Sequence, residues 1–159
     1  MEIRLAQNRD IPGMISLLQQ VGEVHHKIRP DLFRSGAQKY DETALLALLR
    51  DPERPIFIAD DGGVAGYAFC IVKEVRGDSV LCDCRSLYID DLCVDENRRG
   101  SGIGKALLNA VTAYARAENF YNITLNVWSC NESALRFYQR NGLVPQKIGM
   151  EMLLEDKGC

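Results

Sequence analysis

The sequence has no apolar run long enough to cross a lipid bilayer, and its first residues, Met1–Leu5, lack the long apolar core of a secretory signal peptide. It also has no internal repeat, no linker and no low-complexity tract. Its 159 residues are close to the length of one ordinary domain. We therefore expect a single domain over residues 1–159, located in the cytoplasm.

An excess of positive charge is missing as well. The chain has 19 Lys and Arg residues against 22 Asp and Glu residues, which gives a formal net charge of −3 at pH 7. Domains that bind nucleic acid usually carry a basic patch or a strongly basic composition. The composition therefore disfavours nucleic-acid and membrane partners and is typical of a soluble protein.

Histidine is scarce, and the cysteines are not spaced as metal ligands. The two histidines, His25 and His26, are adjacent, and Cys82-x-Cys84 has no second Cys or His pair to complete a zinc site. The six cysteines stand at positions 70, 82, 84, 93, 130 and 159, four of them in apolar, strand-like contexts. Because there is no secretory signal, we expect buried reduced thiols instead of disulfides. The sequence predicts no metal site.

A glycine-rich segment, Arg98–Lys105, is the most informative feature that the sequence does contain. The run before it, Ser86–Val94, is extended in character, and the residues from Ile103 onward repeat apolar side chains with a helical period. The segment therefore lies where a helix begins. Unpaired amides and the positive end of the helix dipole favour anions there, and glycine lets a phosphate approach the backbone. The segment predicts a phosphate-binding loop.

Two familiar phosphate loops do not fit this segment. A P-loop needs a Ser or Thr after its lysine to bind magnesium, but Lys105 is followed by Ala106. The dinucleotide fingerprint needs Gly-x-Gly-x-x-Gly near the start of a βαβ unit, whereas Gly100, Gly102 and Gly104 come after more than half of the chain. A glycine-rich turn with arginines kept for solubility remains the alternative.

The rest of the chain alternates strand-like and helix-like segments. In order, it predicts a strand over 1–6, a helix from a cap at Asn8 or Asp10 through Val21, an irregular polar loop over 22–40, a helix from Asp41 to the residue before Pro52, a hairpin of strands 55–60 and 64–73, a strand over 80–94, a helix after the glycine segment, a strand over 122–127, a helix over 132–141 and a closing strand over 148–154.

Two motifs resemble those of the GNAT superfamily of N-acetyltransferases. Arg99-x-x-Gly102-x-Gly104 is similar to motif A, the pyrophosphate loop for acetyl-coenzyme A, and the segment Asn131–Gly142, with Tyr138 on its helix, is similar to motif B. The resemblance is strong over Leu87–Leu143. It implies an α/β (mixed α+β) fold, with a central mixed, mostly antiparallel sheet of six or seven strands and helices on both faces.

The resemblance also implies a set of residues that contact acetyl-coenzyme A, which acts as co-substrate without a metal. Main-chain donors of the glycine segment would hold the pyrophosphate, with arginine side chains as secondary anchors, and Asn131 would bond the pantetheine arm. Backbone amides near Cys93 and Val94, where the family's strand splays at a bulge, would meet the oxyanion. The set is Leu92, Cys93, Val94, Arg98, Arg99, Gly100, Ser101, Gly102, Ile103, Gly104, Lys105, Asn131, Ala134 and Tyr138. A plain helix N-cap is the alternative for Asn131.

Three side chains are candidates for catalysis. Tyr138 resembles the family's proton donor to the coenzyme A sulfur; its alternative is packing against the preceding helical turn. Asp90 and Asp91 interrupt an apolar strand, and because an unpaired buried carboxylate is costly, at least one should face a cleft or a cation. Strand alternation predicts that they lie on opposite faces. The alternative for this pair is a structural salt bridge.

The segment around the two aspartates resembles the diamine acetyltransferase branch, in which acidic residues attract a cationic amine. Asp90 is the first candidate for the base or for an anchor of the substrate, and Asp91 is its rival. The resemblance implies direct acetyl transfer to a primary amine of a small cationic acceptor, such as a polyamine or an amino-acid-like compound. A covalent route through Cys93 is disfavoured because no histidine is near in sequence. Alternatives are a protein N-terminal or lysine acetyltransferase, an aminoglycoside acetyltransferase, or a non-catalytic acyl-coenzyme A regulatory module; a homodimer is possible.

Overall fold

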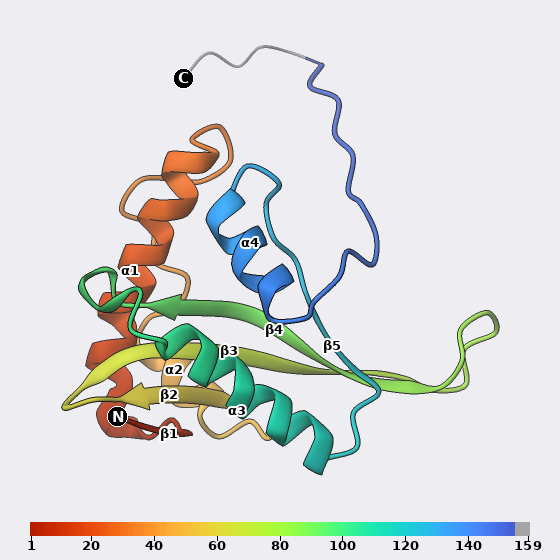
Figure 1. The fold of residues 1–159 in the computed structure, drawn as a ribbon, viewed down its shortest axis with the longest axis horizontal. Helices are drawn as coiled ribbons and strands as arrows, with labels where there is room; N and C mark the ends of the chain where they lie inside the picture. The colour runs from red at the N-terminus through yellow and green to blue at the C-terminus, as the bar shows by residue number, and fades with distance from the viewer. Residues whose placement is uncertain (155–159) are drawn as a thin grey trace.

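The computed structural model describes residues 1–154 and has one central sheet flanked by helices (Figure 1). Its strands are β1 (Glu2–Leu5), β2 (Ile56–Asp60), β3 (Val64–Val75), β4 (Cys84–Val94) and β5 (Asn122–Leu125). Its α-helices are α1 (Ile11–Ile28), α2 (Glu42–Leu48), α3 (Ile103–Ala117) and α4 (Glu132–Arg140), with short 3-10 turns η1 (Asn8–Asp10) and η2 (Glu96–Arg98). No helix in this part of the chain is both long and apolar enough to span a membrane.

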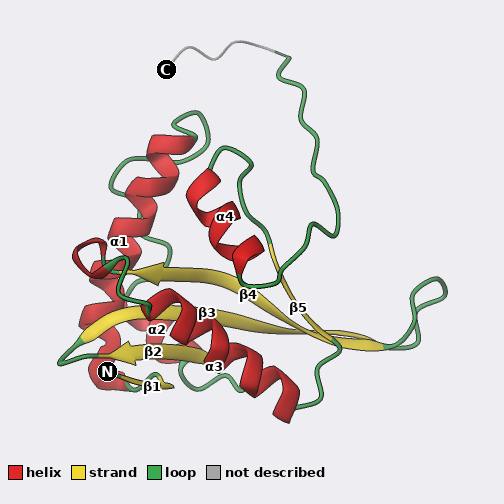
Figure 2. Ribbon diagram, in the orientation of Figure 1, coloured by secondary structure: helices red, strands yellow, loops and turns green. Residues whose placement is uncertain are grey.

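The five strands follow the chain in the order β1-β2-β3-β4-β5. The first three pairs are antiparallel, and β4 and β5 are parallel. Two apolar cores cover the two faces: α1 and α2 pack on one face around Met14, Leu45 and Tyr67, and α3 packs on the other around Leu87 and Leu107. Figure 2 shows α3 in front of the sheet and the other two helices behind it.

A β-bulge in β4 changes which face its residues occupy. Phe69 of β3 is opposite Asp91, but the next residue, Cys70, is opposite Ile89, so Asp90 is the extra residue. In a regular strand, Ile89 and Cys93 would share a face because side chains alternate with a period of two. Here Ile89 belongs to the α3 core and Cys93 to the core under α1 and α2. After the bulge, the side chains of β4 therefore point to the opposite faces from those that regular alternation would give them.

The predicted order of elements is confirmed from β1 to α4, but several boundaries differ. α2 ends at Leu48 and β5 at Leu125, both before their predicted ends. The largest changes are in α1 and β4. α1 continues through residues 22–28, which the sequence assigned to a polar loop. Gly22 does not end the helix. A glycine is needed at this position because the following loop comes close: a Cβ there would be 2.5 Å from the carbonyl oxygen of Ala37. β4 begins at Cys84 and not at Val80, because Asp78 bonds the amides of Val80 and Leu81 and ends the hairpin in a turn.

The predicted closing strand over 148–154 is wrong, and so is the count of six or seven strands. Residues 143–153 form neither helix nor strand, and the sheet of the described residues has five strands. The alternation of apolar residues that predicted a strand is present in the sequence, but the segment runs away from the sheet (Figure 1). Within residues 1–154, neither edge strand of the sheet, β1 or β5, pairs with this segment.

Candidate active site

The candidate site lies where β4 and β5 part. The two strands pair only from Ser86 with Asn122 to Ile89 with Leu125. Beyond that point β4 continues beside β3, and the chain after β5 turns toward α4. The opening forms a cavity of about 370 Å³ that is also lined by α1 and α4.

The cavity brings together residues from both predicted motifs. Of the predicted site residues, it is lined by Asp90, Asp91, Leu92, Cys93, Val94, Arg99, Asn131, Ala134 and Tyr138. The rest of the glycine segment, Arg98 and Gly100 to Lys105, is not part of this lining and forms the adjacent turn into α3. A second hollow, of about 360 Å³, is lined by Arg4, Asp10 and Asp60, but the Arg4 guanidinium donates to both carboxylates and so occupies their charge.

The glycine segment presents an open helix N-terminus. Gly102 is the N-cap of α3, with φ of +86°, and no side chain bonds the first amides of the helix. Gly100 also has a positive φ, +81°, and a Cβ built at either glycine would meet nothing within 4 Å. Left-handed backbone favours glycine, and the first four amides of a helix have no intrahelical partner. The turn therefore offers free donors and open space, which fits a diphosphate.

Side chains around this turn divide into structural and available groups. Arg98 donates to the carboxylate and carbonyl of Asp61 at 2.9 and 3.0 Å, so it ties the turn to the β2–β3 hairpin. The hydroxyl of Ser101 donates to the carbonyl of Arg98 at 2.6 Å and closes the turn. Arg99 is exposed, donates to the carbonyl of Val94 at 3.3 Å and lines the cavity. Arg99 is therefore better placed as an anion anchor than Arg98.

Gly104 has a different structural reason. A Cβ at this position would come within 3.3 Å of the Phe137 ring, because the first turn of α3 packs against α4. Glycine here lets the two helices approach closely. The third glycine of the motif thus joins the phosphate loop to the helix that carries Tyr138.

The free edge of β4 directs two backbone amides toward the opening. The amide of Asp95 donates to the carbonyl of Ala65 at 3.0 Å, so residues 95 and 93 face β3. Backbone groups alternate along a strand, so the amides of Leu92 and Val94 face the side where β5 has departed. Of the two predicted oxyanion donors, Val94 points toward the opening and Cys93 toward β3. The bulge itself lies at Asp90, before the predicted position.

Asp91 is held in a largely buried position beside two aromatic rings. The hydroxyl of Tyr67 donates to its Oδ2 at 2.8 Å, and Tyr67 itself is fully buried and packs edge-on against Phe69. Burial raises the pKa of Asp91 above its ordinary value, opposed by the Tyr67 hydrogen bond and by the charges of Lys39 and His25. A carboxylate with a raised pKa is a better proton acceptor near neutral pH.

Asp90 is already paired with a cation. The ammonium of Lys39 lies 2.7 Å from its Oδ2, and the hydroxyl of Tyr40 donates to the same oxygen at 3.2 Å. Burial lowers the pKa of Lys39, but the hydrogen bond to Asp90 and its charge raise it by more. Asp90 therefore makes the salt bridge that the sequence left as its alternative.

The prediction that the two aspartates lie on opposite faces is wrong. The Tyr40 ring stacks on Phe69 at 5.7 Å, and Tyr67 packs against the same ring at 4.7 Å, so both aspartates bond tyrosines of the α1–α2 side. The bulge is the reason, since its extra residue breaks the alternation between the two positions. Two carboxylates thus lie side by side on one face.

Tyr138 lines the same cavity as Asp91 and packs against Phe137, with ring centroids 5.1 Å apart. Burial, and next the charge of Asp91, raise the pKa of Tyr138 well above its ordinary value, so its hydroxyl keeps its proton at neutral pH. Cys93 is buried, and burial with the charge of Asp91 raises its pKa to about 12. A thiol in this state is a poor nucleophile.

Asn131 is a helix N-cap and also lines the cavity. Its Oδ1 accepts from the amide of Ala134 at 3.2 Å and from the hydroxyl of Ser133 at 3.1 Å. The side-chain oxygen is therefore used by the start of α4. Only its amide nitrogen remains for a ligand.

Sequence reasoning missed the part of the cavity that comes from α1 and from the chain just after β5. Val21, Val24 and His25 line the cavity because α1 continues past Gly22. Their spacing of three and four residues was the available signal, and the glycine hid it. Trp128 also lines the cavity, with the Arg29 guanidinium 5.3 Å from its ring.

The described cysteines, at positions 70, 82, 84, 93 and 130, are all unpaired, and Cys70 and Cys93 are buried as predicted. Cys82 and Cys130 are exposed and Cys84 is half-buried, so the prediction of buried thiols is wrong for these three. Cys159 lies outside the described residues. Within residues 1–154, no group of three His, Cys, Asp or Glu side chains converges as a set of metal ligands.

Comparisons with known proteins agree with this geometry. The sequence profile of the acetyltransferase (GNAT) family matches residues 19–143. An uncharacterized N-acetyltransferase of Methanocaldococcus jannaschii is 30% identical over 92 residues, which are 52% of this chain and 41% of that protein. Glucosamine 6-phosphate N-acetyltransferase 1 of Oryza sativa is 22% identical over 138 residues, which are 87% of this chain and 77% of that protein. The match thus spans less than half the length of the first relative.

Two solved structures give the fold. A tetramutant of the BH1408 protein from Bacillus halodurans has a TM-score of 0.92 and 33% identity, and covers 97% of this chain and 100% of its own. An aminoglycoside acetyltransferase from an uncultured soil metagenomic sample has a TM-score of 0.73 and 22% identity, covering 97% of this chain and 96% of its own. The second likeness concerns the fold alone.

Proposed function

The chain belongs to the acetyltransferase (GNAT) family, and from that membership we propose that it transfers an acetyl group from acetyl-coenzyme A to the primary amine of a small cationic acceptor. The observation that carries the proposal is the cavity between β4 and β5, where an open helix N-terminus adjoins a proton acceptor, Asp91, and a proton donor, Tyr138. These are the groups that acyl transfer to an amine needs.

The donor substrate fits the backbone of the opening. The uncapped amides of α3 and the space at Gly100 and Gly102 suit the pyrophosphate, and Arg99 adds a cation on the cavity side. The pantetheine arm would run between β4 and β5 toward Asn131, whose amide nitrogen can donate to it. The bound donor supplies an activated thioester.

Acetyl transfer to an amine requires a proton to leave the nitrogen. We assign this role to Asp91, acting directly or through a water molecule, because its raised pKa and its place in the cavity suit a base. Asp90 was the first candidate from sequence, but its charge is engaged by Lys39. Asp90 would instead set the position of the acceptor.

The leaving thiolate and the developing oxyanion need one donor each. The protonated phenol of Tyr138 would give its proton to the thiolate sulfur, and the amide of Val94 would donate to the thioester oxygen as it gains negative charge. Direct transfer is favoured over an acetylated cysteine, because the Cys93 thiol is held in its neutral form.

The class of acceptor is inferred from what the chain itself binds beside the cavity. The primary ammonium of Lys39 lies on Asp90, 5.4 Å from the Tyr40 ring centroid, so carboxylate and aromatic face together accommodate an alkylammonium ion. A small molecule with a second cationic group would find the same chemistry. This supports a diamine, a polyamine or a basic amino-acid-like acceptor.

A panel of amines with acetyl-coenzyme A, followed by release of free thiol, tests the proposal. We expect turnover with dicationic amines and much less with neutral amines of the same length. Saturating acetyl-coenzyme A should raise the melting temperature, since it binds only the folded chain. Absence of that shift contradicts the donor site. A shift without thiol release from any amine favours the regulatory module instead, and turnover only of aminoglycosides or peptides replaces the acceptor class.

A further inference from the structure

The ion pair between Lys39 and Asp90 joins the segment between α1 and α2 to the acceptor side of the cavity. The Lys39 ammonium lies 2.7 Å from Oδ2 of Asp90, and both Asp90 and Asp91 line the cavity. Burial lowers the pKa of Lys39, but the hydrogen bond to Asp90 and the negative charges around it, that of Asp91 included, raise it by more. Lys39 is therefore a cation that the chain itself holds beside the two carboxylates.

This ion pair is open to water on one side. The side chain of Lys39 is 44% exposed and that of Asp90 is 18% exposed. An ion pair that water reaches contributes little to stability, and the flexible stem of a lysine can leave it by rotation of its own bonds. If a second ammonium takes the place of Lys39, the carboxylate of Asp90 stays paired. The ammonium of Lys39 can therefore be exchanged for another one.

The backbone around Lys39 is held by contacts that do not use its side chain. The carboxylate of Glu23 accepts from the amide of Gly36 at 2.6 Å, and the side-chain amide of Gln38 donates to the carbonyl of Tyr40 at 2.6 Å. The Tyr40 ring stacks on a phenylalanine of β3, and its hydroxyl donates to the same carboxylate as Lys39. Loss of the lysine contact therefore frees one side chain and leaves the segment in place.

The two carboxylates present a dicationic acceptor with one free partner and one occupied partner. In the proposed reaction, the amine that reacts lies near Asp91, which takes its proton. A monocation needs no other carboxylate. The second ammonium of a dication would pair with Asp90 on the same face, but it meets Lys39 already there. Lys39 and the second cationic group of the acceptor therefore need the same carboxylate.

We propose that Lys39 determines specificity for the acceptor: its ammonium competes with the second cationic group of the acceptor for Asp90 and is displaced when a dication binds. This inference rests on the proposed function, because it concerns the acceptor of that reaction. The competition weakens the binding of dications and reduces their advantage over monocations. A salt bridge kept only for structure predicts the opposite, since its loss would loosen the acceptor side and weaken binding.

Calorimetric titration of two amines into the intact chain tests the competition. The probes are cadaverine, a linear dication, and pentylamine, the monocation of the same length, both with saturating coenzyme A, which has no acetyl group to transfer. Lys39→Met should bind cadaverine about threefold to tenfold more tightly, because it removes a competitor of the strength of an exposed ion pair. The gain for pentylamine should be smaller. Lys39→Arg should keep the weak binding, because a guanidinium still pairs with the carboxylate.

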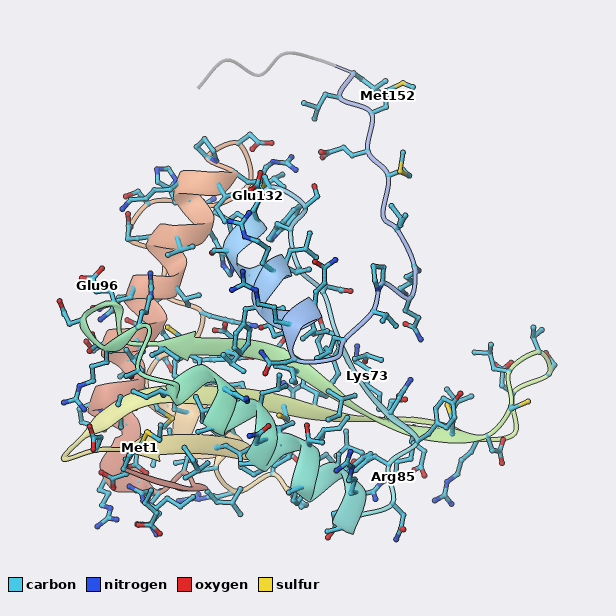
Figure 3. All side chains as sticks on the ribbon, viewed as in Figure 1. Met1, Lys73, Arg85, Glu96, Glu132 and Met152 are labelled. Atoms are coloured by element: carbon cyan, nitrogen blue, oxygen red, sulfur yellow. The ribbon has the colours of Figure 1, made fainter. Side chains whose placement is uncertain are left out.

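Two controls separate this competition from a general effect of charge. Lys73 of β3 lies 3.6 Å from the ring centroid of Tyr88, which also lines the cavity, and Figure 3 shows it on the part of the sheet toward the β3–β4 hairpin, away from α1. Lys73→Met removes the same charge but releases no carboxylate, so the affinity for cadaverine should stay within about twofold. In an Asp90→Asn background, Lys39→Met should give no gain, because the disputed carboxylate is absent.

The outcomes distinguish this inference from the proposed activity. Unchanged or weaker binding of cadaverine to Lys39→Met overturns the competition, as does an equal gain for pentylamine, a gain that persists with Asp90→Asn, or no binding of cadaverine to any variant. Lys39→Gln is a second neutral variant for the case in which Lys39→Met does not fold. Thiol release from acetyl-coenzyme A is measured separately. Tighter binding of cadaverine to Lys39→Met without thiol release supports the competition and contradicts the activity.

Discussion

The two sides of the candidate site are made of different parts of the chain. On the donor side, the groups that face the opening are main-chain amides at the start of α3 and along the free edge of β4. On the acceptor side they are side chains, Asp90 and Asp91, held by tyrosines from other elements. Backbone sites depend on glycine positions that are local in sequence. Side-chain sites depend on register and on distant contacts.

This difference decides how each side should respond to mutation. A main-chain N–H donor survives most side-chain substitutions. It is lost when the new residue cannot adopt the φ value that the backbone needs there. A carboxylate base is lost when one oxygen becomes an amide nitrogen. The following substitutions therefore separate the two sides, and they start with the largest expected loss.

Asp91→Asn should lower kcat/KM for the amine by about 10²–10⁴-fold, the usual contribution of a general base. Binding of acetyl-coenzyme A should be nearly unchanged, because the amide still accepts from the Tyr67 hydroxyl. Asp90→Asn is the matched neighbour: we expect it to raise the KM of the acceptor more than it lowers kcat. Steady-state kinetics with thiol detection and calorimetric titration of the donor measure both. The reverse order of the two variants makes Asp90 the base.

Tyr138→Phe should lower kcat about tenfold to a hundredfold, less than a full general-acid effect because water can replace the phenol. The ring contact with Phe137 is kept, so the melting temperature should change little. Solvent-deuterium effects and a pH profile read proton delivery directly. An unchanged kcat would leave Tyr138 with a packing role only.

Most of the donor side could be predicted from the sequence, because Gly100 and Gly102 encode their own backbone conformation. The acceptor side could not. The bulge at Asp90 exists only through pairing with β3, and it put both aspartates on one face, against the alternation expected for a strand. Lys39 and Tyr67 reach them from 51 and 24 residues away, which no local pattern records.

The same reasoning explains two further errors of prediction, the end of α1 and the closing strand. Gly22 looked like a helix stop, but it is a point of close approach between α1 and the carbonyl of Ala37. The closing strand was predicted from alternation alone, and alternation does not show whether a neighbouring strand is available to pair with it. Both errors concern tertiary contacts and not local propensity.

Gly102→Ala tests the backbone side and should weaken acetyl-coenzyme A binding about tenfold. A non-glycine residue at a left-handed φ costs roughly 1–2 kcal/mol, and its Cβ would enter the space open beside the amides. Gly77→Ala is the matched control, with φ of +61°, open surroundings and a position in the distant β3–β4 turn. It should lose similar stability without loss of donor affinity. Equal affinity in both variants contradicts a phosphate loop at Gly102.

The smallest expected effect is on the pH dependence of stability. It distinguishes Asp91, a carboxylate proposed to act in catalysis, from Asp10, a carboxylate that holds the structure together. The pKa of Asp91 is raised by burial, whereas that of Asp10 is lowered, first by its hydrogen bond from Arg4. Between the ordinary value of 3.8 and its raised value, Asp91 keeps a proton that the unfolded chain has released, so stability falls as the pH rises through that window. The contribution of Asp10 has the opposite sign and is lost as the pH falls below 3.8.

Asp91→Asn should therefore melt at a higher temperature than the unmodified chain at neutral pH, and the gain should shrink as the pH falls toward 3.8. Asp10→Asn should melt at a lower temperature at neutral pH, because Arg4 would lose a charged partner. Thermal denaturation of both variants across pH measures the two signs. A destabilised Asp91→Asn variant at neutral pH would place Asp91 with Asp10 among the structural carboxylates. A stabilised but inactive variant is the result expected of a buried carboxylate that is kept for catalysis.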